Sequence, residues 1–449
     1  MKLARWPFIE PAIALSAIGR VWLLVSSPIT LILLGRIFSP EEQGYYFTFS
    51  SLVALQSFVE LGFAIVIVNN ASHEWSMLRL TERRDVAGEP SVIARLGSIA
   101  RFALRWYAAA AVLFSVAVGI GGQWFLAQRG AVETQWREPW WAVVILTGVL
   151  LCTLPLTALL EGCGQLPTLN RYRLAQAVAG TLVLWGAIVG GAGLWASPFW
   201  LAVAVVRDVA IIFRYRHFFR TLFTARSGLP VHWRREIWPM QWRLAISGVA
   251  NYFAFSLFTP IMFRYQGAAE AGRMGMTLTA VTAIQSVATA WLQVRAPRFG
   301  MLIARRSYAA LDRLFYVTTA TVVGVVVSGA VLFWLVVAAL YAAGHPLAER
   351  VLPPSTTAVF LVAATLVMVS ASESTYLRAH KREPIMVLSV VSSIAIAVLS
   401  WALGSTVGAL GEALGYAGVY ALVVVWETRI LQLARRHWHR DPAPEGAPS

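Results

Sequence analysis

Charged residues are scarce in this sequence. Asp, Glu, Lys and Arg make up 13% of the 449 residues, whereas about 25% is usual for a soluble domain. Cysteine is nearly absent, with two residues in the chain, so neither a disulfide framework nor a cysteine-rich metal site is predicted. Hydrophobic residues reach 58%, against roughly 45 to 50% in soluble proteins. These proportions exclude an ordinary soluble domain and indicate a chain that lies in lipid.

Long apolar runs recur from residue 12 to residue 432. Each can cross a hydrocarbon core that needs about 20 residues of helix, and none shows the alternation of barrel strands. The predicted spans are residues 12–35, 45–69, 102–126, 140–160, 174–194, 198–214, 244–263, 273–294, 314–340, 357–377, 384–404 and 411–428. The predicted fold class is therefore all-α integral membrane, with about 12 transmembrane helices.

The basic residues are distributed unevenly between the two sides of these spans. The net charge of +15 does not indicate nucleic-acid binding, because the basic residues fall in short gaps between apolar runs. With the N-terminus in the cytoplasm, the inside segments hold 29 of the 37 Lys and Arg residues and the outside loops hold six; Arg20 and Arg207 lie within spans. Such a bias places both termini in the cytoplasm, and the predicted location is a bacterial cytoplasmic (inner) membrane.

The connection over residues 215–243 divides the chain into two halves. It combines six arginines with Trp233, Trp238 and Trp242, a mixture typical of a segment in the headgroup layer of an anionic leaflet. We expect an amphipathic linker here, between six-helix lobes over residues 1–214 and 244–440, and a disordered tail over 441–449. A weak internal repeat supports the lobes, because residues 35–44 align with residues 263–272.

A few charges lie inside predicted spans, where each costs about 2.5 to 3.5 kcal/mol unless it is paired or lines a cavity. Arg20 and Glu60 lie at matching depth and fit either a structural ion pair or a phosphate contact beside a proton carrier. Arg207 and Asp208 lie at a similar depth and are able to neutralise neighbouring groups or each other, which favours a role in helix packing. Glu373, near a span end, fits a snorkelling carboxylate or a cation-coupling site. Glu60, Asp208 and Glu373 are thus candidates for coupling or ion pairing.

Arginines also mark the outer ends of the spans at which the two lobes begin. Arg36, Arg264 and Arg273 fit two interpretations, interfacial snorkelling or bidentate binding of a diphosphate. Several amides within spans are able to line a polar cavity or to bond a neighbouring helix: Gln56, Asn251, Gln285 and Gln293. No metal site is predicted, because His437 and His439 are too few ligands.

Two stretches of the sequence resemble a known family. Arg36-Ile-Phe-Ser-Pro-Glu-Glu-Gln-Gly-Tyr-Tyr, followed by a Ser-Leu helix and Glu60-Leu-Gly-Phe, resembles the opening of the polysaccharide (O-antigen type, Wzx-like) flippases of the MOP superfamily. Pro297-Arg-Phe-Gly-Met-Leu-Ile-Ala-Arg-Arg, with Leu311-Asp-Arg-Leu-Phe after it, looks like their loop after helix eight.

The resemblance implies a MATE-like fold, in which two lobes surround a cationic cavity and alternate between inward-facing and outward-facing states. It implies a flippase for a lipid-linked oligosaccharide, with Arg20, Arg264 and Arg273 on the lipid diphosphate. This chain departs from the family by having few basic residues deep in its second half. The partners implied are the lipid-linked oligosaccharide, the bilayer and other polysaccharide-assembly membrane proteins, with no nucleic acid and no cofactor.

Two other functions stay open. A cation-coupled exporter of small molecules has the same fold and needs acidic residues in its cavity. A membrane-embedded polymerase or ligase usually needs a substantial external loop, and Glu41 and Glu42 lie in one of only about nine residues. We therefore expect a transporter that is not an enzyme.

The charge bias predicts a specific topology. Cysteine introduced at Arg95 or Ser227 should react with an impermeant thiol reagent only from the cytoplasmic side, and cysteine at Gly130 or Pro346 only from outside. Labelling of intact cells and of inverted vesicles measures both sides. The opposite pattern at any two of the four sites would refute the orientation.

Overall fold

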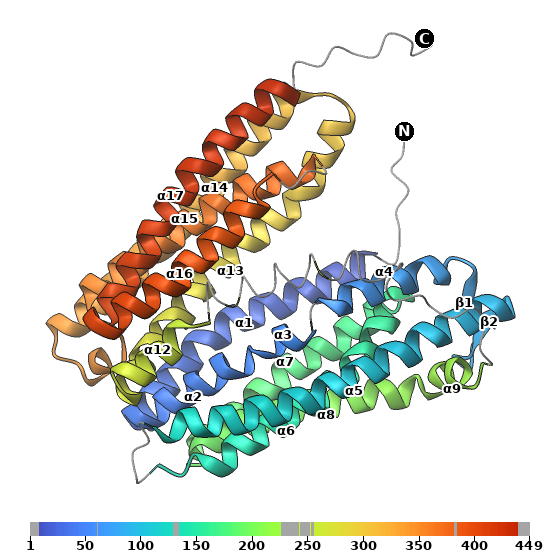
Figure 1. The fold of residues 1–449 in the computed structure, drawn as a ribbon, viewed down its shortest axis with the longest axis horizontal. Coiled ribbons are helices and arrows are strands. Elements are labelled where there is room, and N and C mark those ends of the chain that lie inside the picture. Colours follow the sequence, from blue (N-terminus) through green and yellow to red (C-terminus); the bar gives the residue numbers. More distant parts are fainter. Residues whose placement is uncertain are drawn as a thin grey trace. The chain divides into compact units, whose positions relative to one another are not determined.

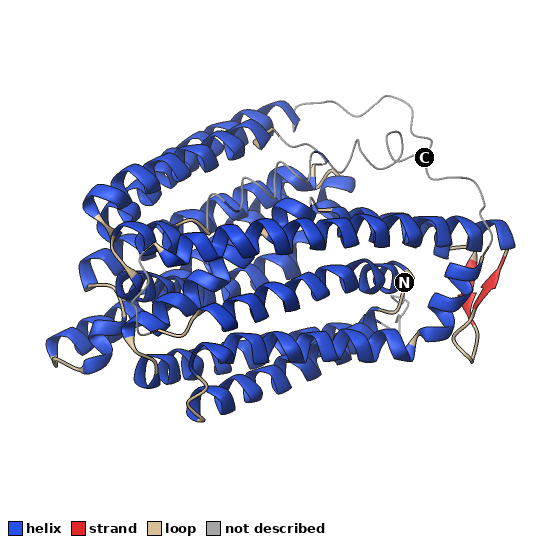
Figure 2. Ribbon diagram, turned by 60° about the horizontal axis from the view of Figure 1, so that its bottom comes forward, coloured by secondary structure: helices blue, strands red, loops and turns tan. Residues whose placement is uncertain are grey.

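The protein is almost entirely helical in a computed structural model that describes residues 9–60, 62–128, 134–225, 242, 252, 256–380 and 384–438. The chain forms two compact units, Met1–Tyr252 with Gly267–Gly272, and Phe253–Gln266 with Arg273–Ser449. Over the described residues the strands form one short hairpin and all other regular elements are helices (Figure 2).

The first unit contains most of the elements (Figure 1). They are α1 (Ile9–Ile37), α2 (Pro40–Val53), α3 (Gln56–Glu60), α4 (Phe63–Trp75), β1 (Leu78–Leu80), β2 (Val86–Gly88), α5 (Pro90–Ala127), α6 (Arg137–Gly162), α7 (Leu166–Val189), η1 (Gly193–Trp195), α8 (Ala196–Arg214) and α9 (Arg216–Thr224).

The remaining elements follow in the second half of the chain. They are α12 (Phe258–Tyr265), α13 (Ala268–Ala304), α14 (Tyr308–Ala342), η2 (Pro346–Arg350), α15 (Pro354–Ala379), α16 (Met386–Val407) and α17 (Ala409–Trp438). In the second unit α15 packs against both α14 and α17, and α16 packs against α17.

Eight described helices are long and apolar enough to cross a membrane, and a bent helix pair brings the number to nine. They include α5, α6, α7 and α8 in the first unit and α14 to α17 in the second. The all-α membrane class is therefore confirmed. The predicted span 244–263 lies largely outside the described residues, so the count of twelve stays a prediction.

The second predicted span is not one straight helix, so the continuous span 45–69 is wrong. It divides into α2, α3 and α4, and the two arms meet at an angle of 50°. Gly62 precedes α4 with φ = 66°, a left-handed conformation that glycine adopts without a Cβ clash. Backbone groups released at such a break need other partners, so breaks at membrane depth occur where the protein buries them or lines a cavity.

Glycine lets α5 and α6 approach closely. The indole Nε1 of Trp140 donates to the Gly119 carbonyl at 3.0 Å, and a Cβ added at Gly122 would lie 2.2 Å from the same indole. Small residues at a helix interface allow this packing in lipid, where the hydrophobic effect does not hold helices together. The outer face of α5 carries exposed Val112, Ile120 and Trp124, as expected for side chains in contact with acyl chains.

The hairpin and α9 lie at one end of α5 (Figure 1). Phe218 and Leu222 of α9 are buried, while Arg216 and Arg220 on its other face are exposed. The Arg101 guanidinium donates to the carbonyls of Leu222 and Ala225, both at 3.2 Å. The start of the predicted linker is therefore an amphipathic helix fixed to the first unit, and its continuation beyond residue 225 lies outside the described residues except Trp242.

Candidate substrate cavity in the first unit

A polar cavity of about 510 Å³ lies within the first unit, between α2, α6, α7 and α8. This volume is within the range of about 300 to 1,000 Å³ that small-molecule sites occupy. Gln56 of α3 also contributes to its lining. The polar side chains that line it are Ser50, Gln56, Thr147, Gln176, Ser197 and Arg207. Tyr46, Phe49 and Trp200 supply its aromatic surface.

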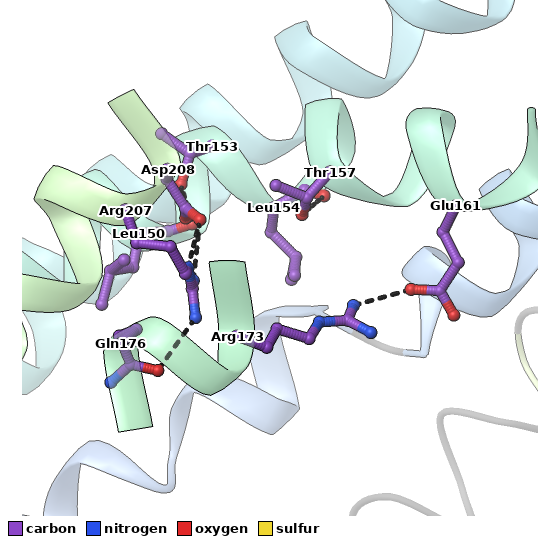
Figure 3. Close-up of polar contacts among 9 residues, drawn as sticks. All are labelled: Leu150, Thr153, Leu154, Thr157, Glu161, Arg173, Gln176, Arg207 and Asp208. Atoms are coloured by element: carbon purple, nitrogen blue, oxygen red, sulfur yellow. Dashed lines mark hydrogen bonds and ion pairs between the residues drawn. The ribbon is translucent and has the colours of Figure 1, made fainter. Parts of the chain in front are cut away.

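Arg207 is the charged side chain that lines this cavity, and it belongs to a hydrogen-bonded network of four side chains (Figure 3). Nε and Nη2 of Arg207 donate to Oδ1 of Asp208, at 2.8 and 2.7 Å. Oδ2 of Asp208 accepts from Oγ1 of Thr153 at 2.6 Å. Nη1 of Arg207 reaches Oε1 of Gln176 at 3.3 Å. The network joins α6, α7 and α8, so it fixes the walls of the cavity as well as its charge.

This geometry determines what the guanidinium is still able to bind. The side chains of Arg207 and Asp208 are 22% and 4% exposed, so both are largely shielded from water and each depends on the other. The Nε and Nη2 edge of arginine is the fork that holds a phosphate or carboxylate in a bidentate way, and Asp208 occupies it. No carboxylate is among the described residues that line the cavity. The cavity is polar but close to neutral.

The structure locates the predicted arginines in different surroundings. Arg36, in the last turn of α1, and Arg264, in the last turn of α12, are exposed. Arg273 of α13 is half-buried, and its Nε donates to the Glu349 carbonyl at 2.7 Å. The side chain of Arg20 is not among those described. The proposed pair of Arg20 and Glu60 therefore stays a prediction.

The predicted acidic residues also lie in different surroundings. Glu60 is the last residue of α3, at the break in the second span, and lies against Tyr107 of α5. Glu373 is only 5% exposed, so the snorkelling interpretation is wrong. Its Oε1 accepts from Oγ1 of Thr428 on α17, at 2.8 Å.

Two further buried carboxylates were missed from the sequence. Glu427 of α17 is 4% exposed, and its Oε1 accepts from Oγ of Ser374 at 3.4 Å. Glu412 is fully buried against Gly404 of α16. Both lie at or near the ends of a predicted span, where the apolar pattern does not separate buried from lipid-exposed positions. Within the described ranges, no group of three His, Cys, Asp or Glu side chains is placed to hold a metal ion.

The predicted amides have separate outcomes. Gln56 lines the cavity, whereas Nε2 of Gln285 donates to the Ala364 carbonyl at 3.3 Å and so bonds a neighbouring helix. Asn251 is outside the described residues. Gln176, Trp200 and Thr153 were not predicted, and an apolar-run analysis has no signal for them because only the folded bundle brings them together.

No protein-family model and no curated protein matches the sequence. Solved structures do match its fold. The inward-facing form of a multidrug resistance MATE family transporter of the MOP superfamily aligns with a TM-score of 0.59 and 12% identity, over 91% of this chain and 99% of that one.

Two other solved structures match the fold as well. A MOP superfamily transporter from Pyrococcus furiosus, described as having a binding pocket of reversed polarity, aligns with a TM-score of 0.55 and 12% identity, over 97% of this chain and 96% of that one. The lipid II flippase MurJ, in an inward closed conformation, aligns with a TM-score of 0.59 and 10% identity, over 94% and 87%. The chain therefore has the MATE-like fold that these structures share.

The Arg207–Asp208 pair yields a stability prediction. Asp208→Leu leaves the guanidinium buried without its counter-ion and should cost about 3 to 5 kcal/mol, whereas Arg207→Met combined with Asp208→Leu should recover most of that loss. The exposed pair of Glu161 and Arg173, 2.7 Å apart in the same view, is the control, because Glu161→Leu should cost about 1 kcal/mol or less. Thermal unfolding of the purified protein measures all three. Equal losses in the single and double variants would contradict the pairing.

Proposed function

We propose that this protein is a membrane transporter that moves a lipid-linked (polyprenyl-diphosphate) oligosaccharide across the cytoplasmic membrane by alternating access, for the synthesis of a cell-surface polysaccharide. Three independent features support this function: the MATE-like fold, the break in the second span and the resemblance of residues 36–46 and 297–315 to polysaccharide flippases. Broken helices are typical of transporters, in which they border the substrate site.

The charge balance of the first-unit cavity is the observation that carries the proposal. An exporter of cations would be expected to present a carboxylate to its cargo. Here the described lining contains no carboxylate, and Asp208, beside the lining residue Arg207, accepts hydrogen bonds from Arg207 and Thr153. A neutral cavity with amide, hydroxyl and aromatic groups fits the glycan of a lipid-linked precursor better than a cation.

For the diphosphate we propose the arginines near the span ends. Arg36 and Arg264 are exposed, and the Nε of Arg273 donates to the Glu349 carbonyl. A guanidinium group carries five N–H donors in a planar fork, which suits the oxygens of a diphosphate. Arg20 completes the set by the family resemblance. An enzyme would instead need a catalytic group on a substantial loop, and the described loops between helices are short.

For coupling we propose Glu373 in preference to Asp208 and Glu60. Asp208 is neutralised by its ion pair. Glu373 of α15 lies beside Glu427 of α17, and these two helices pack against each other. Each carboxylate accepts a hydrogen bond from the other helix, Glu373 from Thr428 and Glu427 from Ser374. Buried carboxylates within a bundle commonly carry protons or cations in transporters.

Deletion of the gene tests the function directly. We expect lipid-linked oligosaccharide to accumulate on the cytoplasmic face and surface glycan to disappear, and the wild-type gene should reverse both. Lysine variants of Arg20, Arg36, Arg264 and Arg273 then test the headgroup site, because lysine keeps the charge but loses the bidentate fork.

The deletion strain and the lysine variants test separate points, the function and the headgroup site. Lysine variants that are as defective as alanine variants, at normal protein abundance, support a bidentate contact. Normal glycan in every lysine and every alanine variant would place the headgroup elsewhere without affecting the function. Absence of precursor accumulation in the deletion strain would refute the function itself.

If Glu373 couples transport to an ion gradient, a neutral variant should lose the response of flipping to that gradient. Glu373→Gln should make flipping in proteoliposomes insensitive to an imposed pH or sodium gradient, because a neutral amide cannot exchange a proton or balance a cation. Glu349→Gln, on the exposed η2 turn of the same unit, should respond to the gradient as the wild type does. A gradient response retained by Glu373→Gln would exclude Glu373 from coupling.

A further inference from the structure

The cavity of the first unit has a hydrogen-bonding pattern that restricts its ligand. Oε1 of Gln176 accepts from Arg207 at 3.3 Å, which fixes the amide orientation and leaves Nε2 as a donor. The hydroxyls of Ser50 and Thr147 donate to carbonyls of their own helices, at 3.3 and 2.8 Å. Their oxygens therefore face a ligand as acceptors. A ligand in this cavity is therefore able to accept a hydrogen bond from Gln176 and to donate hydrogen bonds to Ser50 and Thr147.

The charge of the cavity excludes several classes of ligand. A phosphate would need the Nε and Nη2 edge of Arg207, and this edge already holds Asp208. A cation would need a carboxylate, and the described lining contains none. A purely apolar ligand would offer no acceptor to the Nε2 of Gln176, and an unsatisfied donor costs about 1 to 3 kcal/mol when it is buried.

One wall of the cavity is aromatic. Trp200 is 39% exposed, and Gly180 of α7 lies next to its indole, since a Cβ added there would be 3.1 Å from the ring. Glycine therefore leaves room for the indole on this wall. Aromatic side chains offer a large, rigid, apolar face beside polar groups. The C–H faces of a sugar ring pack on such a surface, while its hydroxyls both donate and accept at the ring edge.

We propose that this cavity binds one uncharged sugar ring of the cargo, with Trp200 as the stacking surface and the Gln176 amide as an oriented donor to a ring hydroxyl. Arg207 and Asp208 act here as positioning residues, because they orient Gln176 and contact no cargo charge. The inference rests on the proposed function for the origin of the sugar. It assigns the glycan, and not the diphosphate, to the first unit.

Binding of free sugars to the full chain in lipid nanodiscs tests the assignment. The probes are glucose, galactose, mannose and N-acetylglucosamine, together with the monosaccharides released by acid from the surface polysaccharide of the producing cell. Saturation-transfer NMR detects weak binding of each. We expect at least one neutral sugar to bind, and an equal concentration of inorganic diphosphate to leave its signal unchanged.

Matched variants identify the cavity. Trp200→Leu should lower binding by about two- to tenfold, the effect expected for loss of one ring contact, and Gln176→Met should lower it by a similar factor. Trp195→Leu is the control, because Trp195 is 40% exposed, in the same unit and outside the cavity. Thermal unfolding of each variant separates lost binding from lost folding.

Three results would overturn the proposal. They are the absence of any sugar signal, an equal effect of the Trp195 and Trp200 variants, and displacement of the sugar by diphosphate. Failure of the proposed function is seen separately, as a deletion strain without accumulated precursor. Sugar binding that depends on Trp200 would then still identify the cavity as a sugar site.

Discussion

A charge inside a lipid-embedded bundle must be compensated by another protein group, and the Arg207–Asp208 pair in the first unit meets this constraint. Two of the three guanidinium nitrogens bond Asp208 and the third bonds Gln176. Without the aspartate, the arginine would be a buried charge in a low-dielectric environment. With it, the cavity keeps polar groups but loses its net charge. The proposal that this cavity takes an uncharged group of the cargo rests on this one interaction.

The fold class was predictable from the sequence because it depends on composition and run length. Helices α5 to α8 and α14 to α17 coincide with long apolar runs, and length together with hydropathy is enough to recognise them. The break between α2 and α4 was not predictable in this way. The two arms taken together are apolar enough to pass as one span, and Gly62, before the second arm, has a left-handed conformation. A hydropathy pattern contains no information on backbone dihedrals.

The candidate site was predictable only in part. Arg207 and Asp208 stood out as charges in an apolar run, and their mutual neutralisation was a correct interpretation of their chemistry. Adjacent residues on a helix do not face the same side, so helix geometry alone does not predict that the long arginine side chain folds back to its neighbour. Thr153 and Gln176 lie 55 and 31 residues away from their partners. Contacts at that separation arise from the packing of α6, α7 and α8.

The acidic residues of the two units have different environments. In the first unit Asp208 is bound to a guanidinium, whereas in the second unit Glu373 and Glu427 are bound to hydroxyls of the opposite helix. A hydroxyl satisfies one carboxylate oxygen but does not neutralise its charge. The charges of Arg207 and Asp208 therefore balance each other without a ligand. The proposed function assigns cargo selection by shape and hydrogen bonding to the cavity beside this pair, and it assigns coupling to Glu373, whose described hydrogen bond comes from a hydroxyl.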